Sequence, residues 1–164
     1  MLTGTAPLDT PAPIPVPIPV PIPISGLVPH AGAMCLLRAV LSHDASSIAC
    51  DAASHRDPLN PLRRDGALPA VAGVEYALQA MAAHGALIGG ALTGGPGGAP
   101  GFLASLRGVA LRAARLDDVA GDLLVEARAL AMEASGFVYD FRVMADGRTL
   151  LDGRAAIIVP AAGP

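Results

Sequence analysis

The chain has few aromatic residues, few charged residues and no excess of positive charge. Aromatic residues make up 3% of its 164 residues and Trp is absent, whereas apolar residues make up 52%. A core can form, but it must consist mostly of Ala, Val and Leu, which favours close packing of the elements. The net charge of -3 argues against a nucleic-acid partner. The length is typical of a single domain.

Cysteine is also scarce. Cys35 and Cys50 are the only two, without a CxxC spacing, and no secretory signal is recognisable. We therefore expect free thiols, buried as small strand residues, and a cytoplasmic location. No His, Cys, Asp and Glu spacing indicates a metal, and the Gly-rich run "GGPGG" lacks the strand-to-helix context of a phosphate loop. The sequence therefore predicts no metal and no cofactor.

Proline is concentrated at the N-terminus, where "PAPIPVPIPVPIPI" alternates Pro with aliphatic residues from Pro11 to Ile24. Each Pro fixes φ and removes a backbone donor, so neither a helix nor a central strand is expected there. We interpret residues 1–24 as a polyproline-II or disordered extension. The folded domain is expected to cover residues 25–160.

Residues 69–92 form an apolar run that is long enough to cross a bilayer. The run contains Glu75, Gln79 and His84 and has no flanking basic cluster. These features favour a central helix covered by protein on all sides, and we expect no membrane span.

The sequence pattern predicts strands both before and after this helix. Asp146-Gly147 separates two strand-like runs and predicts a type I′ hairpin. One long helix followed by an antiparallel run predicts an α+β domain with a curved sheet wrapped around the helix, whose free edge favours dimerisation. The expected strands are residues 34–42, 46–54, 102–112, 123–133, 137–145 and 148–159.

Glu75 is the only acid in the central helix, and Gln79 follows it by one turn. An i, i+4 pair lets the amide hydrogen-bond the carboxyl group and fix its orientation. A surface-facing Glu is the alternative, but the neighbouring residues offer no polar strip. Burial would favour the protonated form, which can donate a proton.

His55 lies in a loop that Pro58 and Pro61 stiffen, and a neutral imidazole is the usual general base. A solvated loop histidine is an equal alternative. The first amides of the helix, at Val71 or Ala72, could hold a developing oxyanion. Base, acid and oxyanion donors together suit removal of a C2 proton and a C3 hydroxyl from an acyl thioester. Of the other histidines, His30 and His84 are expected to be structural, and Tyr76, Met81 and Phe102 are expected in the core.

Three motifs carry a family resemblance: "LVPHAGAMCLLRAV", "SHRDPLNPLR" and "GVEYALQAMAAHGAL". In this order they resemble the ApeP-like branch of the 3-hydroxyacyl acyl-carrier-protein dehydratases, associated with aryl polyene biosynthesis, over about residues 25–159. The resemblance implies the hot-dog fold. It also implies that His55 is the catalytic histidine, Glu75 the catalytic carboxylate and Gln79 the residue that orients it.

The resemblance further implies that base and acid meet across a dimer interface and that an acyl carrier protein delivers the substrate. A homodimer and a hot-dog heterodimer both fit. Arg63 and Arg64 lie in an insertion relative to the fatty-acid enzymes; either they contact the carrier protein or its phosphopantetheine, or they are solvated. Ala70 replaces the usual Gly before the helix, which leaves the choice between the Val71 and Ala72 amides open, and Arg38 replaces an Asp after the first strand.

Three functional hypotheses follow. The first is dehydration of 3-hydroxyacyl-ACP, with Glu75 as direct acid or as the holder of a water. The second is a hot-dog thioesterase in which Glu75 activates water. The third is a non-catalytic partner of another dehydratase or synthase. Acyl chain length is not encoded in any recognisable motif.

Overall fold

The computed structural model describes residues 17–89 and 101–160. One α-helix, α1 (Gly73–Gly89), and short 3-10 turns accompany the strands. The 3-10 turns are η1 (Gly32–Met34), η2 (Ser54–Arg56) and η3 (Ala70–Ala72). The strands are β1 (Ile22–Pro23), β2 (Ala39–His43), β3 (Ser47–Ala52), β4 (Phe102–Leu111), β5 (Leu123–Glu133), β6 (Gly136–Ala145) and β7 (Arg148–Ile158).

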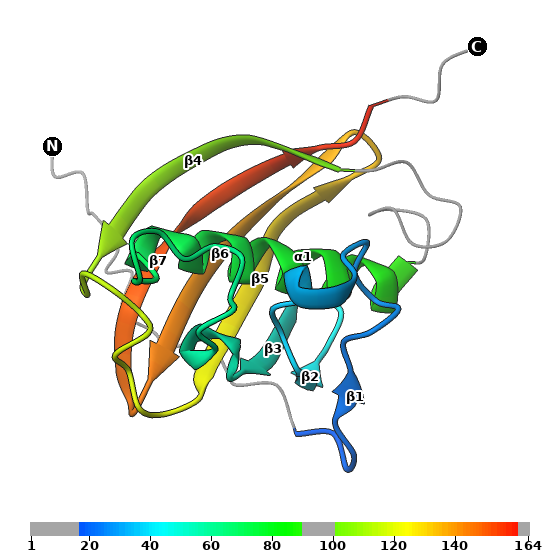
Figure 1. Cartoon of the computed structure of the whole chain (residues 1–164). Coiled ribbons are helices and arrows are strands. Elements are labelled where there is room, and N and C mark those ends of the chain that lie inside the picture. Colours follow the sequence, from blue (N-terminus) through cyan, green and yellow to red (C-terminus); the bar gives the residue numbers. More distant parts are fainter. Residues whose placement is uncertain (1–16, 90–100, 161–164) are drawn as a thin grey trace, which may run out of the picture.

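The strands form one antiparallel sheet in the order β1-β2-β3-β5-β6-β7-β4. The sheet curves around α1, which lies in its concave face (Figure 1). The predicted α+β domain with a sheet wrapped around a central helix is confirmed. Asp146 and Gly147 connect β6 to β7 with φ values of 51° and 73°, and positive φ at both positions is the type I′ geometry that was predicted.

Helix α1 is buried on most of its surface because its residues are small and apolar. It packs against β3, β5 and β6. Tyr76, Met81 and His84 are buried along its length. Within the described residues, no helix is long and apolar enough to cross a membrane.

The N-terminal boundary was predicted wrongly. Ile22 and Pro23 pair with β2, the Ile18 amide donates to the Leu41 carbonyl at 3.1 Å, and Ile24 is buried. Proline is compatible with an edge strand, since only one side of such a strand needs amide donors. The last part of the proline-rich segment therefore belongs to the sheet, whereas the prediction for residues 1–16 lies outside the described residues.

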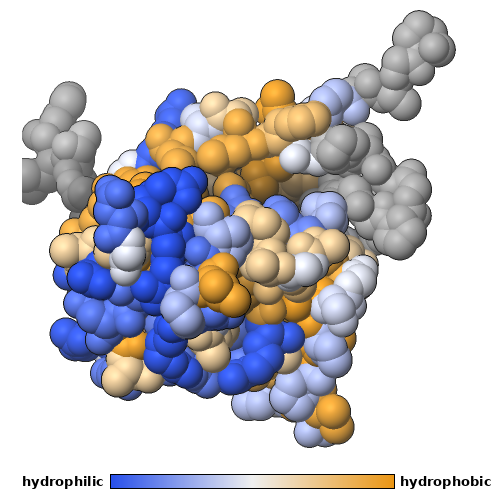
Figure 2. Space-filling model, in the orientation of Figure 1, coloured by the Kyte–Doolittle hydropathy of each residue, from blue (hydrophilic) through white to orange (hydrophobic). Residues whose placement is uncertain are grey.

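Strand β4 forms an apolar edge. It pairs only with β7 among the described strands, so its other edge is open. Phe102, Leu103, Leu106 and Leu111 of β4 are exposed. Figure 2 shows hydrophobic residues gathered on the side of the molecule where β4 lies. Phe102 was expected in the core, and that expectation is wrong; Tyr76 and Met81 are core residues as expected.

Candidate active site

His55 lies in η2, directly after β3, and its residue is fully buried. Its Nε2 atom is 3.1 Å from the carbonyl oxygen of Val119. Because a carbonyl only accepts, Nε2 carries the proton, and the basic nitrogen is Nδ1. Nδ1 is buried and has no partner in the described structure. Burial lowers the pKa of His55, which favours the neutral ring that a base requires.

Glu75 lies in the first turn of α1, and its side chain is 28% exposed. Its Oε1 atom accepts from Nε2 of Gln79 at 3.3 Å, so the predicted i, i+4 contact is present. Gln79 is fully buried. Its amide is fixed from both sides, because Nε2 also donates to the Met34 carbonyl at 2.7 Å and Oε1 accepts from the Leu36 amide at 3.0 Å.

His30 is a further member of the site that the sequence interpretation treated as structural. Its Nε2 atom lies 3.1 Å from Glu75 Oε1. Nothing in the spacing of the two residues could reveal this contact, since they are far apart in sequence and belong to different elements. Within the described residues, no hydrogen bond or ion pair joins His55 to Glu75.

Leu36 connects the two halves of the site through its backbone. Its amide binds Gln79, as described, and its carbonyl accepts from the Ser54 hydroxyl at 2.7 Å. Ser54 in turn accepts from the Tyr76 hydroxyl at 2.8 Å, and Tyr76 accepts from Asn60 Nδ2 at 3.0 Å. The turn that carries His55 and the helix that carries Glu75 are therefore held to one residue of the preceding segment. Ser54, Asn60 and Tyr76 were not predicted as part of the site.

The two candidate oxyanion donors differ in their contacts. The Ala72 amide donates to the Pro69 carbonyl at 2.9 Å, so it is already used. The Val71 amide forms no hydrogen bond within the described residues, and the Val71 residue is 53% exposed. Val71 is therefore the better candidate of the pair.

Arg63 and Arg64 lie in the loop between His55 and α1. Arg63 donates to the carbonyls of Asp57 and Gly66, both at 2.9 Å, and pairs with Asp117 at 3.6 Å. This side chain closes the loop on itself. Arg64 is exposed and bonds only to carbonyls of its own loop, such as that of Pro61. Arg64 is thus free to meet a partner, whereas Arg63 has a structural role.

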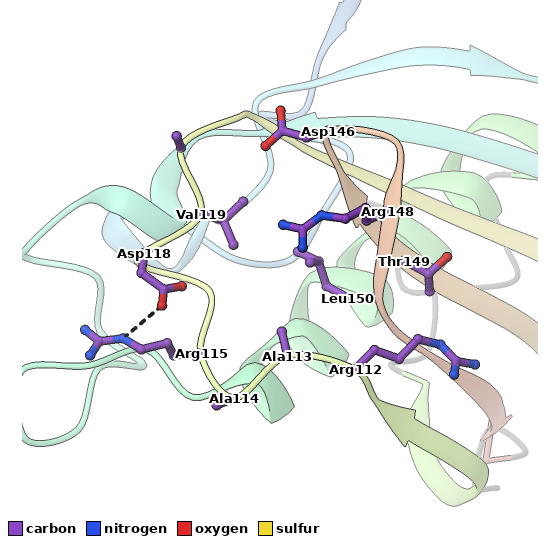
Figure 3. A pocket seen from close by; sticks show the side chains of 11 residues that line it. Arg112, Ala113, Ala114, Arg115, Asp118, Val119, Asp146, Arg148, Thr149 and Leu150 are labelled. Carbon is purple, nitrogen blue, oxygen red and sulfur yellow. Dashed lines mark ion pairs between the residues drawn. The ribbon is translucent and has the colours of Figure 1, made fainter.

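Next to the His55 turn lies an open cavity of about 620 Å³. Val119, whose carbonyl holds His55, lines this cavity, and Figure 3 shows Arg148 reaching into it. His55, Glu75 and Gln79 do not line it. The cavity is therefore separate from these three predicted site residues.

His84 is buried, with Nδ1 2.9 Å from the Tyr139 hydroxyl and Nε2 2.9 Å from the Asp44 carbonyl, which is the hydrogen-bonded structural role expected. Cys35 and Cys50 are both free thiols, as predicted. Only Cys50 is also a buried strand residue; for Cys35 that part of the prediction is wrong, because it follows η1 and is half-buried. Burial raises the pKa of Cys50 to about 12, so this thiol is inert at neutral pH.

Arg38 lies beside the His55 turn and takes part in an ion-pair chain. It pairs with Asp51 and with Asp122, and Asp122 also pairs with Arg56 at 2.6 Å. The guanidinium groups of Arg56 and Arg38 lower the pKa of Asp122. The side-chain contacts of Arg38 are thus with Asp51 of β3 and with Asp122, and none is with His55 or Glu75 within the described residues.

One curved antiparallel sheet wrapped around one long helix is the hot-dog fold. Among hot-dog proteins the chain belongs to the ApeP-like family: the family model described as ApeP dehydratase matches residues 22–163. No curated protein sequence matches the chain.

Solved structures agree on the fold. The chain is similar to the dehydratase heterocomplex ApeI:P from Xenorhabdus doucetiae, at 21% identity and a TM-score of 0.71, with 85% of this chain and 92% of that chain covered. It is also similar to zebrafish thioesterase superfamily member 2, at 14% identity and a TM-score of 0.56, with 84% and 93% covered. A mutant thioesterase from Pseudomonas aeruginosa gives 18% identity and a TM-score of 0.53, with 76% and 82% covered.

Proposed function

We propose that this protein removes water from 3-hydroxyacyl thioesters on an acyl carrier protein and yields trans-2-enoyl thioesters. Membership of a dehydratase family supports this reaction class. The proposal is carried by two contrasting groups that are both held, through Ser54 and Gln79, to the backbone of Leu36. One is the buried neutral imidazole of His55, whose basic nitrogen has no partner in the described structure. The other is the carboxyl group of Glu75, of which only Oε1 accepts a hydrogen bond within the described residues.

In the proposed reaction, Nδ1 of His55 takes the C2 proton of the thioester. The electron pair of that C–H bond forms the C2–C3 double bond, and the C3–O bond breaks. The leaving hydroxyl takes the proton of Glu75 and departs as water. The Val71 amide donates to the thioester oxygen while negative charge develops on it. Afterwards the imidazolium and the carboxylate exchange a proton with solvent, which restores the starting state.

We further propose that the base and the acid of each site come from different subunits. The absence of any contact between His55 and Glu75 within the described chain is consistent with this. The open apolar edge of β4 supplies a surface for a second hot-dog subunit, which is either another copy or a related chain.

The proposed substrate carrier is an acidic acyl carrier protein, with Arg64, an exposed cation of the loop between His55 and α1, as a proposed contact. We place the reaction in aryl polyene or fatty-acid-like biosynthesis, in the cytoplasm, on the strength of the family alone. No cofactor is needed for the proton transfers described, since each has a side chain to perform it.

The decisive experiment incubates purified protein with a 3-hydroxyacyl acyl carrier protein and identifies the product by mass spectrometry. An enoyl thioester, lighter by one water, supports dehydration, and a released free acid would instead indicate a thioesterase. His55→Ala and Glu75→Gln are each expected to abolish most of the dehydration. His43→Ala, on β2 and away from these contacts, serves as the matched control and should keep wild-type activity.

The third hypothesis, a non-catalytic partner subunit, makes a different prediction in the same assay. The protein alone would then form no enoyl product, and the joint activity with a second hot-dog subunit would not change in His55→Ala or Glu75→Gln. Substitutions on the β4 edge would still abolish the joint activity.

A further inference from the structure

We propose that His30 is a positioning residue of this site: with Gln79 it occupies one oxygen of Glu75 and leaves the other to carry the reacting proton. The inference rests on the proposed dehydration and names a residue that the sequence interpretation had left as structural. His30 precedes η1 in the segment that lies against α1 (Figure 1).

The direction of the Gln79 contact follows from the backbone. The Leu36 amide can only donate and the Met34 carbonyl can only accept, so the Gln79 amide has a single orientation. Its nitrogen therefore points to Glu75, and Gln79 donates to Glu75 Oε1 at 3.3 Å.

The His30 contact falls on the same oxygen. Nε2 of His30 is 3.1 Å from Glu75 Oε1. Oε1 therefore has two nitrogen neighbours, Nε2 of Gln79 and Nε2 of His30, whereas no contact of Oε2 is seen within the described residues. In the proposed arrangement, Glu75 carries its proton on Oε2 and His30 turns its Nε2–H toward Oε1. The two donors thereby fix which oxygen faces the substrate and hold the carboxyl plane in one orientation.

His30 differs from the structural histidine of the same molecule. Both ring nitrogens of His84 have protein partners, as the Tyr139 and Asp44 contacts show. His30 has Nε2 on Glu75, whereas its Nδ1 is buried without a partner in the described structure. The recorded polar contact of the ring is thus with the proposed acid, and this is the arrangement expected of a residue that acts through Glu75.

The test compares His30→Ala and His30→Gln with His43→Ala, a half-buried histidine on β2. We expect kcat to fall by about tenfold to a hundredfold in His30→Ala at an unchanged KM, because a misoriented acid affects the reaction and not the binding of substrate. His30→Gln retains an amide donor at similar reach and should recover most of kcat. His43→Ala should match the wild type.

Thermal unfolding of each variant accompanies the kinetics. Wild-type kcat in a folded His30→Ala variant would overturn the positioning role, as would equal losses in His30→Ala and His30→Gln that follow their loss of thermal stability. These results leave the dehydration itself intact. A wild-type protein that forms no enoyl product contradicts the proposed function and removes the role of His30 with it, so the two failures are distinguishable.

Discussion

Gln79 has two tasks at the residue scale, since it orients Glu75 and also satisfies two backbone groups. Replacing it with Leu would leave the buried Leu36 amide and the Met34 carbonyl without partners. We expect Gln79→Leu to lower the free energy of unfolding by about 1–3 kcal/mol for each unsatisfied group. Denaturant titration measures this loss, and dehydratase activity should fall as well, because Glu75 loses a donor.

Gln79→Glu is a sharper test of the Gln79 orientation, because the Glu side chain has nearly the same shape as Gln. One carboxylate oxygen can still accept from Leu36, but the other faces the Met34 carbonyl and Glu75, which are both acceptors. This variant should therefore be at least as unstable as Gln79→Leu at neutral pH. A Gln79→Glu protein as stable as the wild type would mean that the amide orientation argued above is wrong.

The site was predictable where its contacts are local. Glu75 and Gln79 are one turn apart, so helical spacing alone brings them together, and His55 stood out in a loop stiffened by proline. The contacts of His30 and Leu36 span long stretches of sequence and depend on how the segment before β2 lies against α1. No periodicity in the sequence reports such a contact. The choice between the Val71 and Ala72 amides likewise required the backbone geometry of η3.

Gly73 matters at the scale of the element because it lets α1 begin close to the sheet. A Cβ atom at this position would lie 2.5 Å from Cδ2 of Leu151, a fully buried residue of β7. We expect Gly73→Ala to destabilise the protein by about 1–3 kcal/mol through overpacking, despite the higher helix propensity of Ala. Thermal or denaturant unfolding provides the measurement.

The close approach of Gly73 to Leu151 can also be tested with a compensating substitution. Shortening Leu151 to Ala removes the atoms that a new methyl group would meet, so Gly73→Ala should cost less in a Leu151→Ala background than in the wild type. The two single variants and the double variant form a thermodynamic cycle. If the effects are simply additive, the close approach of α1 and β7 is not the source of the destabilisation.

Most elements were predictable because each has a local signal. Alternation gave the strands on the C-terminal side, and Asp146-Gly147 gave the hairpin between β6 and β7. Strand β1 was missed because proline excludes a central strand, and the possibility of an edge strand in the proline-rich segment was not considered. An edge strand needs hydrogen bonds on one side only, and which strand lies at the edge is a property of the sheet rather than of the segment.

At the scale of the whole molecule, buried histidines make folding sensitive to acid. Burial lowers the pKa of both His55 and His84 below the usual value of 6.5. The unfolded chain therefore binds protons that the folded protein excludes, and the stability from these groups is present above about pH 6.5 and lost as the pH falls below it. Unfolding free energies measured between about pH 7.5 and pH 5 should decrease toward acid.

Carboxylates affect the stability of the folded protein in a separate, more acidic pH range. The pKa of Asp122, paired with Arg56 and Arg38, is lowered from 3.8, so its contribution is lost only at lower pH. A His84→Gln variant cannot take up a proton at this position and should show a shallower slope between about pH 6.5 and pH 5. An unchanged slope would assign the acid sensitivity to groups other than His84.

The assembly of the site from two subunits is the last property that belongs to the whole molecule. If His55 of one subunit acts with Glu75 of the other, His55→Ala and Glu75→Gln homodimers are both inactive, but a mixed dimer of the two contains one intact site. Random re-pairing makes half of the dimers mixed, and each has one working site of two, so about a quarter of wild-type activity should return.

The experiment mixes the two purified variants, re-equilibrates the subunits in mild denaturant and follows enoyl thioester formation. Leu106→Lys on the β4 edge, where Leu106 is 38% exposed, should prevent both dimerisation and the recovery. Leu130→Lys, at a 46% exposed position on β5, is the matched control. Activity that stays absent in a dimer proven to be mixed would show that both groups act within one chain, and the site would then have to close by a movement of the His55 turn toward α1.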